Sequence, residues 1–218
     1  MKAVITGANR GIGLALCAQL VKKGYEVFAL CRKKSKELEK LSAKVIEKVD
    51  VTDIASLEKA KIQINTPLDL IVNNAGIYHR DTFEDIDFNE ITLHFEVNSI
   101  APLKVVKTFL PLLKSGSKVI MISSTSGSIT NADSGKSFSY KASKAALNML
   151  SKNLAIFLKE KKISVGIFHP GYVKTDMTSD EATLEPKESA QGLAKLIEEL
   201  SLENSGEFRH VEGHTIPW

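Results

Sequence analysis

The stretch ITGANRGIG, residues 5–13, decides the fold class of this sequence. It follows the β-rich run KAVITG (residues 2–7) and leads into a segment with helical spacing. Its glycines, Gly7, Gly11 and Gly13, permit a tight turn and let a pyrophosphate approach the helix N-terminus. Their spacing is not the G-x-G-x-x-G of the common dinucleotide fingerprint. A glycine-rich turn between strand and helix, without a ligand, is therefore the alternative.

Strand and helix patterns alternate along the whole chain. Seven β-rich runs are predicted as strands, at residues 2–7, 25–31, 44–50, 68–76, 118–124, 163–171 and 206–211. Helical spacing occupies residues 14–24, 54–64, 90–116, 139–162 and 188–200. This repetition predicts a parallel sheet covered by helices on both faces, and several runs are apolar at every position, as doubly buried strands require. With no Pro/Gly/Ser-rich linker, we expect one α/β domain over residues 1–218, a doubly wound Rossmann fold with a seven-stranded parallel sheet.

Bulk properties narrow the functional classes. The chain has 43% apolar and 25% charged residues, as soluble globular proteins do, and no apolar run approaches the length of a membrane span. The net charge is only +3 and the lysines are scattered, which argues against nucleic-acid binding. Because the sequence opens directly into its first strand without a leader pattern, we expect a cytoplasmic protein.

Cysteines and histidines give no metal motif. Cys17 and Cys31 have neither the spacing of a metal site nor that of a disulfide framework, so both are expected to be reduced core residues. We predict no metal site, because no ligand spacing relates His79, His94, His210 and His214.

The residues after the second strand bear on cofactor choice. An NAD-binding unit usually carries an acidic residue there, which binds the ribose 2′-hydroxyl. This sequence has Arg32, Lys33 and Lys34 instead. A guanidinium suits a 2′-phosphate, and Arg10 in the glycine loop is a second candidate cation. The pattern favours NADP(H), with NAD(H) as the alternative cofactor and a solvated helix start as the alternative interpretation.

The run SYKASK, residues 139–144, places Tyr140 and Lys144 one helical turn apart on the same face. The general alternative is an amphipathic helix with two snorkelling side chains. Lowering a tyrosine pKa from about 10 to about 7 requires roughly 4 kcal/mol. A unit positive charge about 4 Å away supplies roughly that amount at an effective dielectric constant of 20.

Seven motifs in order resemble the short-chain dehydrogenase/reductase family over nearly the whole chain. They are TGANRGIG, VDVTD, NNAG, EVNSIAP, ISSTSG, YKASK and HPGYVKTDM. The ending, KESAQGLAKLIEEL through NSGEFRHVEGHTIPW, resembles the C-factor/sniffer-like carbonyl reductases of that family. The resemblance implies an NADPH-dependent reductase of aldehydes and ketones, acting on a small-molecule carbonyl or alcohol substrate. A cofactor-binding signalling or sensor protein with little turnover is the alternative.

Catalytic roles are implied by the resemblance. Tyr140 would be the general acid/base, and Lys144 would lower its pKa and bind the nicotinamide ribose. Ser124 would orient the carbonyl oxygen, preferred over Ser123 because S-x-x-G ends at Gly127. Asn98 would hold a water that links Lys144 to solvent, or else be a polar residue that kinks a long helix.

The resemblance also implies which residues line the dinucleotide. They are Thr6, Gly7, Asn9, Arg10, Gly11, Ile12 and Gly13 in the loop, Arg32, Asp50 and Val51 on the adenosine side, Asn74, Ala75 and Gly76, Tyr140 and Lys144, and Pro170, Gly171, Val173 and Thr175 on the nicotinamide side. Thr175 is equally a candidate N-cap. The family's usual interface helices imply a homodimer, with a tetramer as the alternative.

Four expectations concern the periphery. The loop at residues 129–139 is predicted to lie at the pocket mouth, and His169 is predicted to be structural. Trp218 should pack on its own chain or on a second subunit. The acidic side chains of the preceding loop are predicted to be solvated, namely Asp81, Glu84, Asp85 and Asp87.

Overall fold

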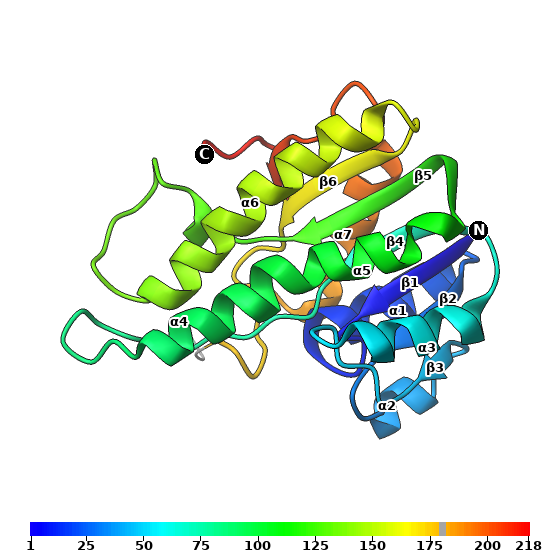
Figure 1. Cartoon of the computed structure of the whole chain (residues 1–218), viewed down its shortest axis with the longest axis horizontal. Helices are drawn as coiled ribbons and strands as arrows, with labels where there is room; N and C mark the ends of the chain where they lie inside the picture. Colours follow the sequence, from blue (N-terminus) through cyan, green and yellow to red (C-terminus); the bar gives the residue numbers. More distant parts are fainter. Residues whose placement is uncertain (179–181) are drawn as a thin grey trace.

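The computed structural model describes residues 1–178 and 182–218. Their seven strands form one parallel sheet in the order β3-β2-β1-β4-β5-β6-β7 (Figure 1). The strands are β1 (Lys2–Thr6), β2 (Glu26–Leu30), β3 (Lys44–Ile46), β4 (Leu68–Asn73), β5 (Leu113–Ile122), β6 (Ser164–His169) and β7 (Phe208–His210). Each overlaps its predicted run, so the predicted seven-stranded parallel sheet is confirmed.

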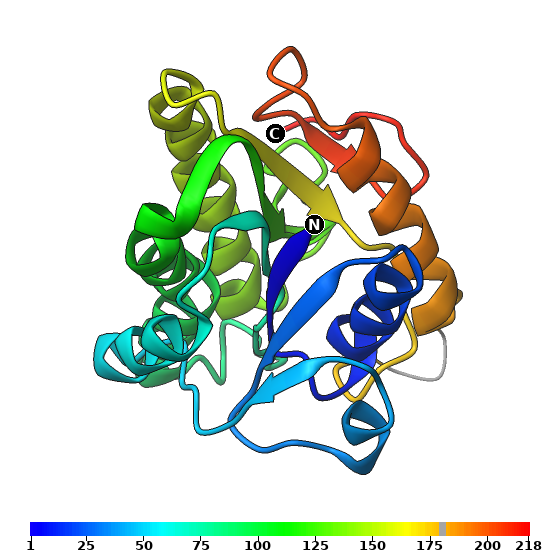
Figure 2. The same cartoon turned by 90° about the vertical axis from the view of Figure 1, so that its right-hand side faces the viewer.

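Helices cover both faces of the sheet, as Figure 2 shows. One face carries α1 (Gly11–Lys22), α2 (Lys36–Glu39) and α7 (Pro186–Glu199). The other carries α3 (Ile54–Ile64), α4 (Phe88–Phe95), α5 (Ala101–Phe109) and α6 (Phe138–Lys159). Among the described residues, no helix is long and apolar enough to span a membrane.

The core lies in two layers, one on each face of the sheet. Leu16 and Leu20 of α1 pack with Leu193 of α7 over one face, while Leu57 and Phe109 pack over the other, and all five are at most 1% exposed. Burying one such side chain contributes about 1.5–3 kcal/mol. Cys17 and Cys31 are free and buried, which confirms that they are core thiols.

The predicted helix at residues 90–116 is wrong in two respects. A five-residue π-helical turn, η1 (Glu96–Ile100), joins α4 to α5, and a 3-10 turn, η2 (Leu110–Leu112), ends the helical segment. Pro111 has no backbone N–H to continue a helix, and β5 begins at Leu113, five residues before the predicted strand. The solvated helix start offered as the alternative for Arg32–Lys34 is present a few residues later, as the four-residue α2, whose N-cap Ser35 accepts the Leu38 N–H.

The order of the strands places the chemistry-bearing motifs together. The chain reverses its direction of winding between β1 and β4, which lie side by side. Open α/β sheets bind ligands outside the carboxyl ends of the strands at such a switch point. The glycine loop, the NNAG run, the serine pair and the His-Pro-Gly turn all follow carboxyl ends at this edge.

Candidate active site

The glycine loop presents an uncapped helix N-terminus. Gly7 and Gly11 have φ angles of +63° and +53°, which favour glycine, and they turn the chain from β1 into α1. Helix α1 has no side-chain cap and no acidic residue in its first turn. By contrast, Asp53 caps α3 by accepting the Ala55 and Ser56 N–H groups. The free N–H groups and positive end of α1 therefore fit an anion such as a pyrophosphate.

The loop is tightly joined to the end of β4. A Cβ on Gly13 would stand 2.3 Å from the Gly7 oxygen and 2.5 Å from Asn74 Nδ2, so only glycine fits. Asn74 Nδ2 donates to the carbonyls of Thr6 and Gly7, at 3.0 and 3.1 Å. Thr6 Oγ1 accepts the N–H groups of Asn74 and Ala75. The side chains of Thr6 and Asn74 therefore hold the glycine loop against the NNAG segment that ends β4.

On the adenosine side, the Asp50 carboxylate accepts hydrogen bonds from the backbone and side chain of Thr52, which hold its pKa below the usual range. Val51 and Ala75 line a small hollow beside Thr6. Arg32 is exposed, and its positive charge also lowers the pKa of Asp50.

Cations near the predicted 2′-phosphate position differ in their pairing. Lys34 is held by Glu39 at 2.7 Å and by Glu47 at 3.8 Å. In the described part of the chain, no ion pair involves the Arg32 guanidinium. Arg10 instead reaches Asp176 at 2.7 Å and bridges the glycine loop to the segment after β6.

That segment lies against the glycine loop. A Cβ on Gly11 would stand 3.3 Å from Thr175 Cγ2. Thr175 Oγ1 accepts the Met177 N–H within a turn; no helix begins there in the described residues, so the predicted N-cap role is wrong, and the next helix, α7, is capped by Glu185. Val173 pairs with Leu184, and the Pro170 carbonyl accepts the Ser189 hydroxyl, so the turn is fixed on both sides.

Tyr140, Lys144 and Ser124 come together beside this turn. The Ser124 side chain interacts with the Tyr140 phenol and lowers its pKa. Lys144 is only 6% exposed; its Nζ lies 5.7 Å from the Tyr140 ring centroid and donates to the Ile122 carbonyl at 2.9 Å. Ser123 instead donates to Asn148 Oδ1 at 2.6 Å, away from the phenol. The structure thus supports the choice of Ser124 over Ser123.

Close packing explains the glycine of the S-x-x-G pattern. Gly127 ends the 3-10 turn η3 (Thr125–Gly127), which follows Ser124. A Cβ on Gly127 would stand 2.7 Å from the Lys144 carbonyl carbon and 2.9 Å from Asn148 Nδ2. A side chain there would push the serine loop away from α6, and with it Ser124 from Tyr140.

Asn98 ties the π turn to the catalytic helix. Its Oδ1 accepts the Ile77 N–H at 2.9 Å, and its Nδ2 donates to the Ile77 carbonyl and to Ser143 Oγ, each at 3.0 Å. Ser143 lies between Tyr140 and Lys144, and its backbone carbonyl accepts the Ser99 hydroxyl. The helix distortion predicted as the alternative is therefore present, and Asn98 also fixes the register of α6. Its water-binding role stays a prediction.

The pKa values of the free chain differ from the expectation based on sequence. Burial raises the pKa of Tyr140, Tyr78 raises it further, and the Ser124 hydrogen bond lowers it. Burial lowers the pKa of Lys144 to about 8. In the free chain, desolvation is the largest influence on the Tyr140 pKa and raises it, so the lowering by Lys144 that the resemblance implies is not seen there. At neutral pH Tyr140 is a protonated phenol beside a cationic amine.

Two residues of the site were missed by sequence reasoning. Tyr78 contacts the Tyr140 ring edge-on, with ring centroids 5.0 Å apart, and its hydroxyl lies 3.2 Å from Ser137 Oγ. Asp81, predicted to be solvated, is 2% exposed. Its Oδ2 accepts both the N–H and the hydroxyl of Ser139. Asp81 therefore caps α6 one residue before Tyr140, from a loop 58 positions away.

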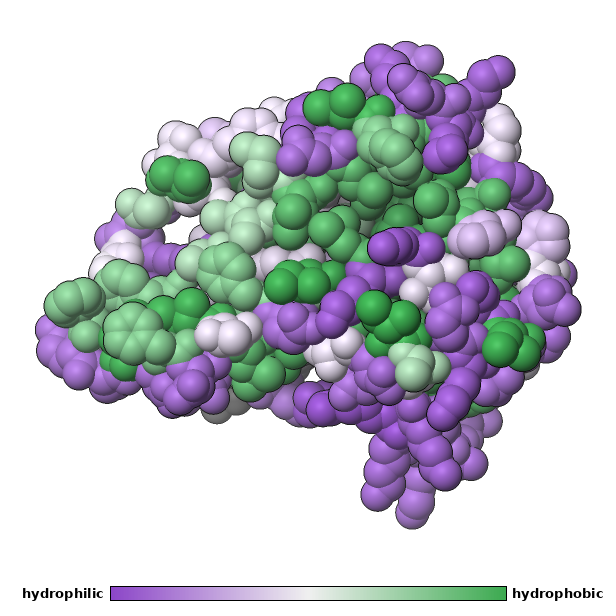
Figure 3. Space-filling model, in the orientation of Figure 1, coloured by the Kyte–Doolittle hydropathy of each residue, from purple (hydrophilic) through white to green (hydrophobic). Residues whose placement is uncertain are grey.

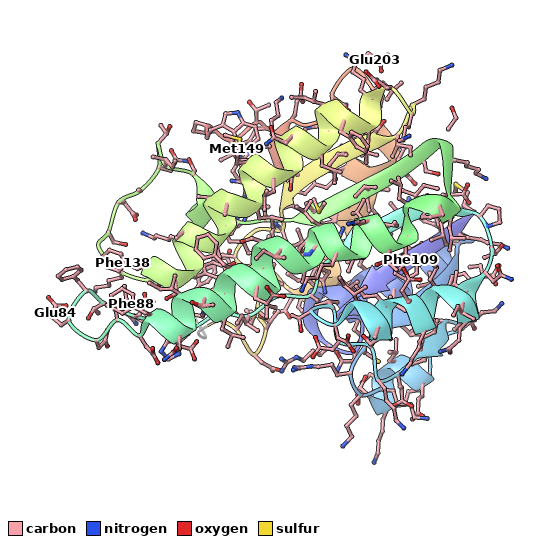
Figure 4. The ribbon with its side chains drawn as sticks, in the orientation of Figure 1. Glu84, Phe88, Phe109, Phe138, Met149 and Glu203 are labelled. Atoms are coloured by element: carbon pink, nitrogen blue, oxygen red, sulfur yellow. The ribbon has the colours of Figure 1, made fainter. Side chains whose placement is uncertain are left out.

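Removing this cap should destabilise the protein. Asp81→Ala leaves the buried Ser139 N–H without its partner, so we expect the free energy of unfolding to fall by about 2–3 kcal/mol. Glu84→Ala, in the same loop but exposed at the tip labelled in Figure 4, should change it by less than about 0.5 kcal/mol. Urea denaturation followed by circular dichroism measures both. Equal stability of the two variants would contradict the capping role.

The remaining predictions are located as follows. Asn9 and Ile12 are half-buried in the glycine loop, and Gly76 lies against Asn98. His169 is buried, its Nδ1 accepts the Thr125 N–H, and burial lowers its pKa to about 3, all in agreement with a structural role. Trp218 stacks on Phe208 of its own chain, with ring centroids 5.6 Å apart.

Comparisons with known proteins agree with this geometry. A family model described as short chain dehydrogenase matches residues 1–185. The chain is 33% identical to 1-hydroxy-2-glutathionyl-2-methyl-3-butene dehydrogenase of Rhodococcus sp. (strain AD45), over 99% of this chain and 98% of that one. It is 34% identical to C-signal of Myxococcus xanthus, over 70% of this chain and 93% of that protein.

A solved structure shows the same architecture. NADPH-bound carbonyl reductase from chicken fatty liver superposes with a TM-score of 0.92 at 33% identity, covering 100% of this chain and 98% of that one. Together with C-signal, it confirms the predicted likeness to C-factor-type proteins and carbonyl reductases.

Proposed function

This chain belongs to the short-chain dehydrogenase family, and on that premise we propose that it is an NADPH-dependent carbonyl reductase. The observation that carries the proposal is that Tyr140 lies over the buried Lys144 and interacts with Ser124. A protein that only bound a dinucleotide would have no need for a phenol held between a hydroxyl and an ammonium group.

The chain's own residues would handle orientation and proton transfer. Bound NADPH would supply the hydride for the carbonyl carbon. Ser124 Oγ donates a hydrogen bond to the carbonyl oxygen and orients it, and the Tyr140 hydroxyl donates its proton to that oxygen. Burial raises the pKa of Tyr140, which keeps it in the proton-donating form at neutral pH.

Lys144 would stabilise the phenolate that proton donation leaves behind. Taking the 5.7 Å between its Nζ and the ring centroid, a unit charge contributes roughly 3 kcal/mol at an effective dielectric constant of 20. That is about two pKa units. The Lys144 pKa of about 8 leaves the amine mostly cationic at pH 7.

The loops at the same sheet edge would hold the dinucleotide. The uncapped N-terminus of α1 would bind the pyrophosphate through Gly11, Ile12 and Gly13, with Gly7 and Asn9 completing the turn. Asp50 and Val51 would lie beside the adenine. Ala75 and Gly76 would lie along the nicotinamide ribose, with Gly171, Val173 and Thr175 at the carboxamide.

Exposed aromatic side chains near Tyr140 favour lipophilic substrates. Tyr78 and Phe83 are 41% and 73% exposed, and the Phe83 ring lies 6.1 Å from that of Phe138. Phe88 and Phe138 lie at the same end of the molecule in Figure 4. We therefore expect small or lipophilic aldehydes and ketones as substrates.

The buried, unpaired cysteines agree with the cytoplasm as the location of the protein.

Fluorescence titration with NADPH and NADH, followed by NADPH absorbance on a panel of aldehydes and diketones, tests the proposal. Binding of NADPH with consumption on at least one carbonyl compound is expected. Binding without turnover would favour the second candidate, a cofactor-binding signalling protein, which the 34% identity to C-signal supports. No binding of either dinucleotide would refute both.

Arg32 should determine the preference of the protein for NADPH over NADH. Arg32→Asp removes the unpaired guanidinium and repels a 2′-phosphate, so we expect the ratio of NADPH to NADH affinity to fall about tenfold or more. Lys33→Asp makes the same change in charge at the next exposed position and serves as the matched control. A ratio that falls equally in both variants, or in neither, would show that Arg32 has no specific role.

An apolar face supports the predicted homodimer. Met149, Ile156 and Phe157 of α6 are 62%, 64% and 58% exposed, and Leu93 and Ile100 beside them are 46% and 41% exposed. Figure 3 shows hydrophobic side chains gathered on the face that carries α4, α5 and α6, and Figure 4 labels Met149 there. Light scattering of the full chain distinguishes a dimer from a monomer or tetramer.

A further inference from the structure

The turn after β7 is fixed by its own backbone. His210 N–H donates to the His214 carbonyl and Gly213 N–H to the His210 carbonyl, both at 2.8 Å. Arg209 donates through Nη2 and Nε to the Gly213 carbonyl, at 2.8 and 3.2 Å. Gly213 has a φ angle of +102°. Residues 210 and 214 are therefore held opposite each other across a tight turn.

Three metal-binding side chains meet on this turn. The rings of His210 and His214 stack with centroids 4.5 Å apart. Glu212 Oε2 lies 3.5 Å from His210 Nδ1 and 3.9 Å from His214 Nδ1, and one ligand atom from each residue lies within 4.8 Å of the others. We propose that His210, Glu212 and His214 form a binding site for a divalent transition-metal ion such as Zn²⁺.

The distances suit a small ion. Zinc binds imidazole nitrogen and carboxylate oxygen at about 2.0–2.2 Å, so neighbouring ligand atoms in a tetrahedral site lie about 3.3 Å apart. The two distances from Glu212 exceed this by only a few tenths of an ångström. To bind one ion together, the three side chains must approach each other, and the His214 ring must move out of its stack with His210. The side chains of His214 and Glu212 are 60% and 69% exposed, so solvent leaves room for this movement. His210, at 17%, is the anchored ligand.

The ligand chemistry selects the class of metal. Two imidazoles and one carboxylate suit zinc, copper or nickel, whereas Mg²⁺ and Ca²⁺ prefer oxygen ligands. Glu212 N–H donates to His210 Nδ1 at 3.2 Å, and this exposed N–H can turn to water when a metal takes the lone pair.

The site adjoins the catalytic edge without belonging to it. His210 is the register partner of His169 across β6 and β7, and their ring centroids are 5.0 Å apart. His169 is not a ligand, because it is buried and its Nδ1 accepts the Thr125 N–H. The ion would secure the end of the sheet, and this inference does not depend on reductase activity.

Isothermal titration of the full, tag-free chain with Zn²⁺ and with Mg²⁺ tests the site. We expect one Zn²⁺ per chain, no Mg²⁺ binding, and a rise in Tm of roughly 5–11 °C at a Zn²⁺ concentration about 100 times Kd. His214→Gln and Glu212→Gln should each weaken Zn²⁺ binding at least about tenfold. His79→Gln, which changes an exposed histidine elsewhere, is the matched control and should bind normally.

Two results would overturn the proposal. One is the absence of Zn²⁺ binding by the wild-type chain. The other is unchanged binding by both His214→Gln and Glu212→Gln, which would place the ion elsewhere. Because His214 and Glu212 are exposed, we expect both variants to fold, and circular dichroism verifies this. Co²⁺ provides a second measurement in the wild-type chain, since a tetrahedral site gives visible absorbance that excess Zn²⁺ should abolish.

Discussion

Tyr140→Phe should lower kcat for carbonyl reduction by about 10²–10⁴-fold, the usual contribution of a positioned general acid. The variant keeps the aromatic ring against Tyr78 and over Lys144 and loses only the hydroxyl that interacts with Ser124. NADPH affinity should therefore stay within a few-fold of wild type. Stopped-flow absorbance gives kcat, and fluorescence titration gives the affinity.

Tyr78→Phe is the matched control for this substitution. It removes a phenol hydroxyl that lies 3.2 Å from Ser137 Oγ and leaves the edge-on ring contact in place. We expect it to reduce kcat by far less than Tyr140→Phe does. A Tyr140→Phe enzyme that retained more than about a tenth of wild-type kcat would refute the general-acid assignment.

Among single glycine-to-alanine substitutions in the glycine loop, Gly13→Ala should lower the stability of the protein most. The added Cβ would stand 2.3 Å from the backbone oxygen of Gly7, an atom that cannot move without separating α1 from β1. We expect a loss of about 3 kcal/mol in the free energy of unfolding, and a Tm lower by roughly 6–12 °C. Weaker dinucleotide binding should accompany it, because the first turn of α1 would shift.

Gly135→Ala controls for the loss of glycine itself. A Cβ there meets nothing within 4 Å, so Tm should change by only a degree or two. Differential scanning calorimetry compares the two variants. A Gly13→Ala chain with the Tm of wild type would show that the loop can relax around the new methyl group, contrary to the packing argument.

The sequence was most informative where the physical cause is local. The glycine loop and the four-residue spacing of Tyr140 and Lys144 each depend on neighbours within one turn of chain. The choice of Ser124 over Ser123 followed from the S-x-x-G pattern of the resemblance, and the packing of Gly127 on α6 explains its glycine. Alternating strands and helices likewise sufficed for the order of elements.

What escaped prediction depends on partners far apart in the sequence or on backbone irregularities. Asp81 looks like a solvated loop residue until the fold brings it to Ser139, 58 positions away. His210 and His214 are four positions apart, and the turn around Gly213 brings their side chains together. The phenol pKa was misjudged for a related reason, since burial is a property of the whole fold.

The π turn at Glu96–Ile100 makes the segment from α4 to α5 sensitive to the loss of one residue. A wider turn of this kind is what remains when one residue is inserted into a regular α-helix. Deleting that residue would restore a regular α-helix. It would also rotate α4 by about 100° about the helix axis relative to α5. The Asn98 amide would then lose Ile77 and Ser143 together. The contacts of Asn98 with Ile77 and Ser143 thus depend on the one extra residue of the π turn.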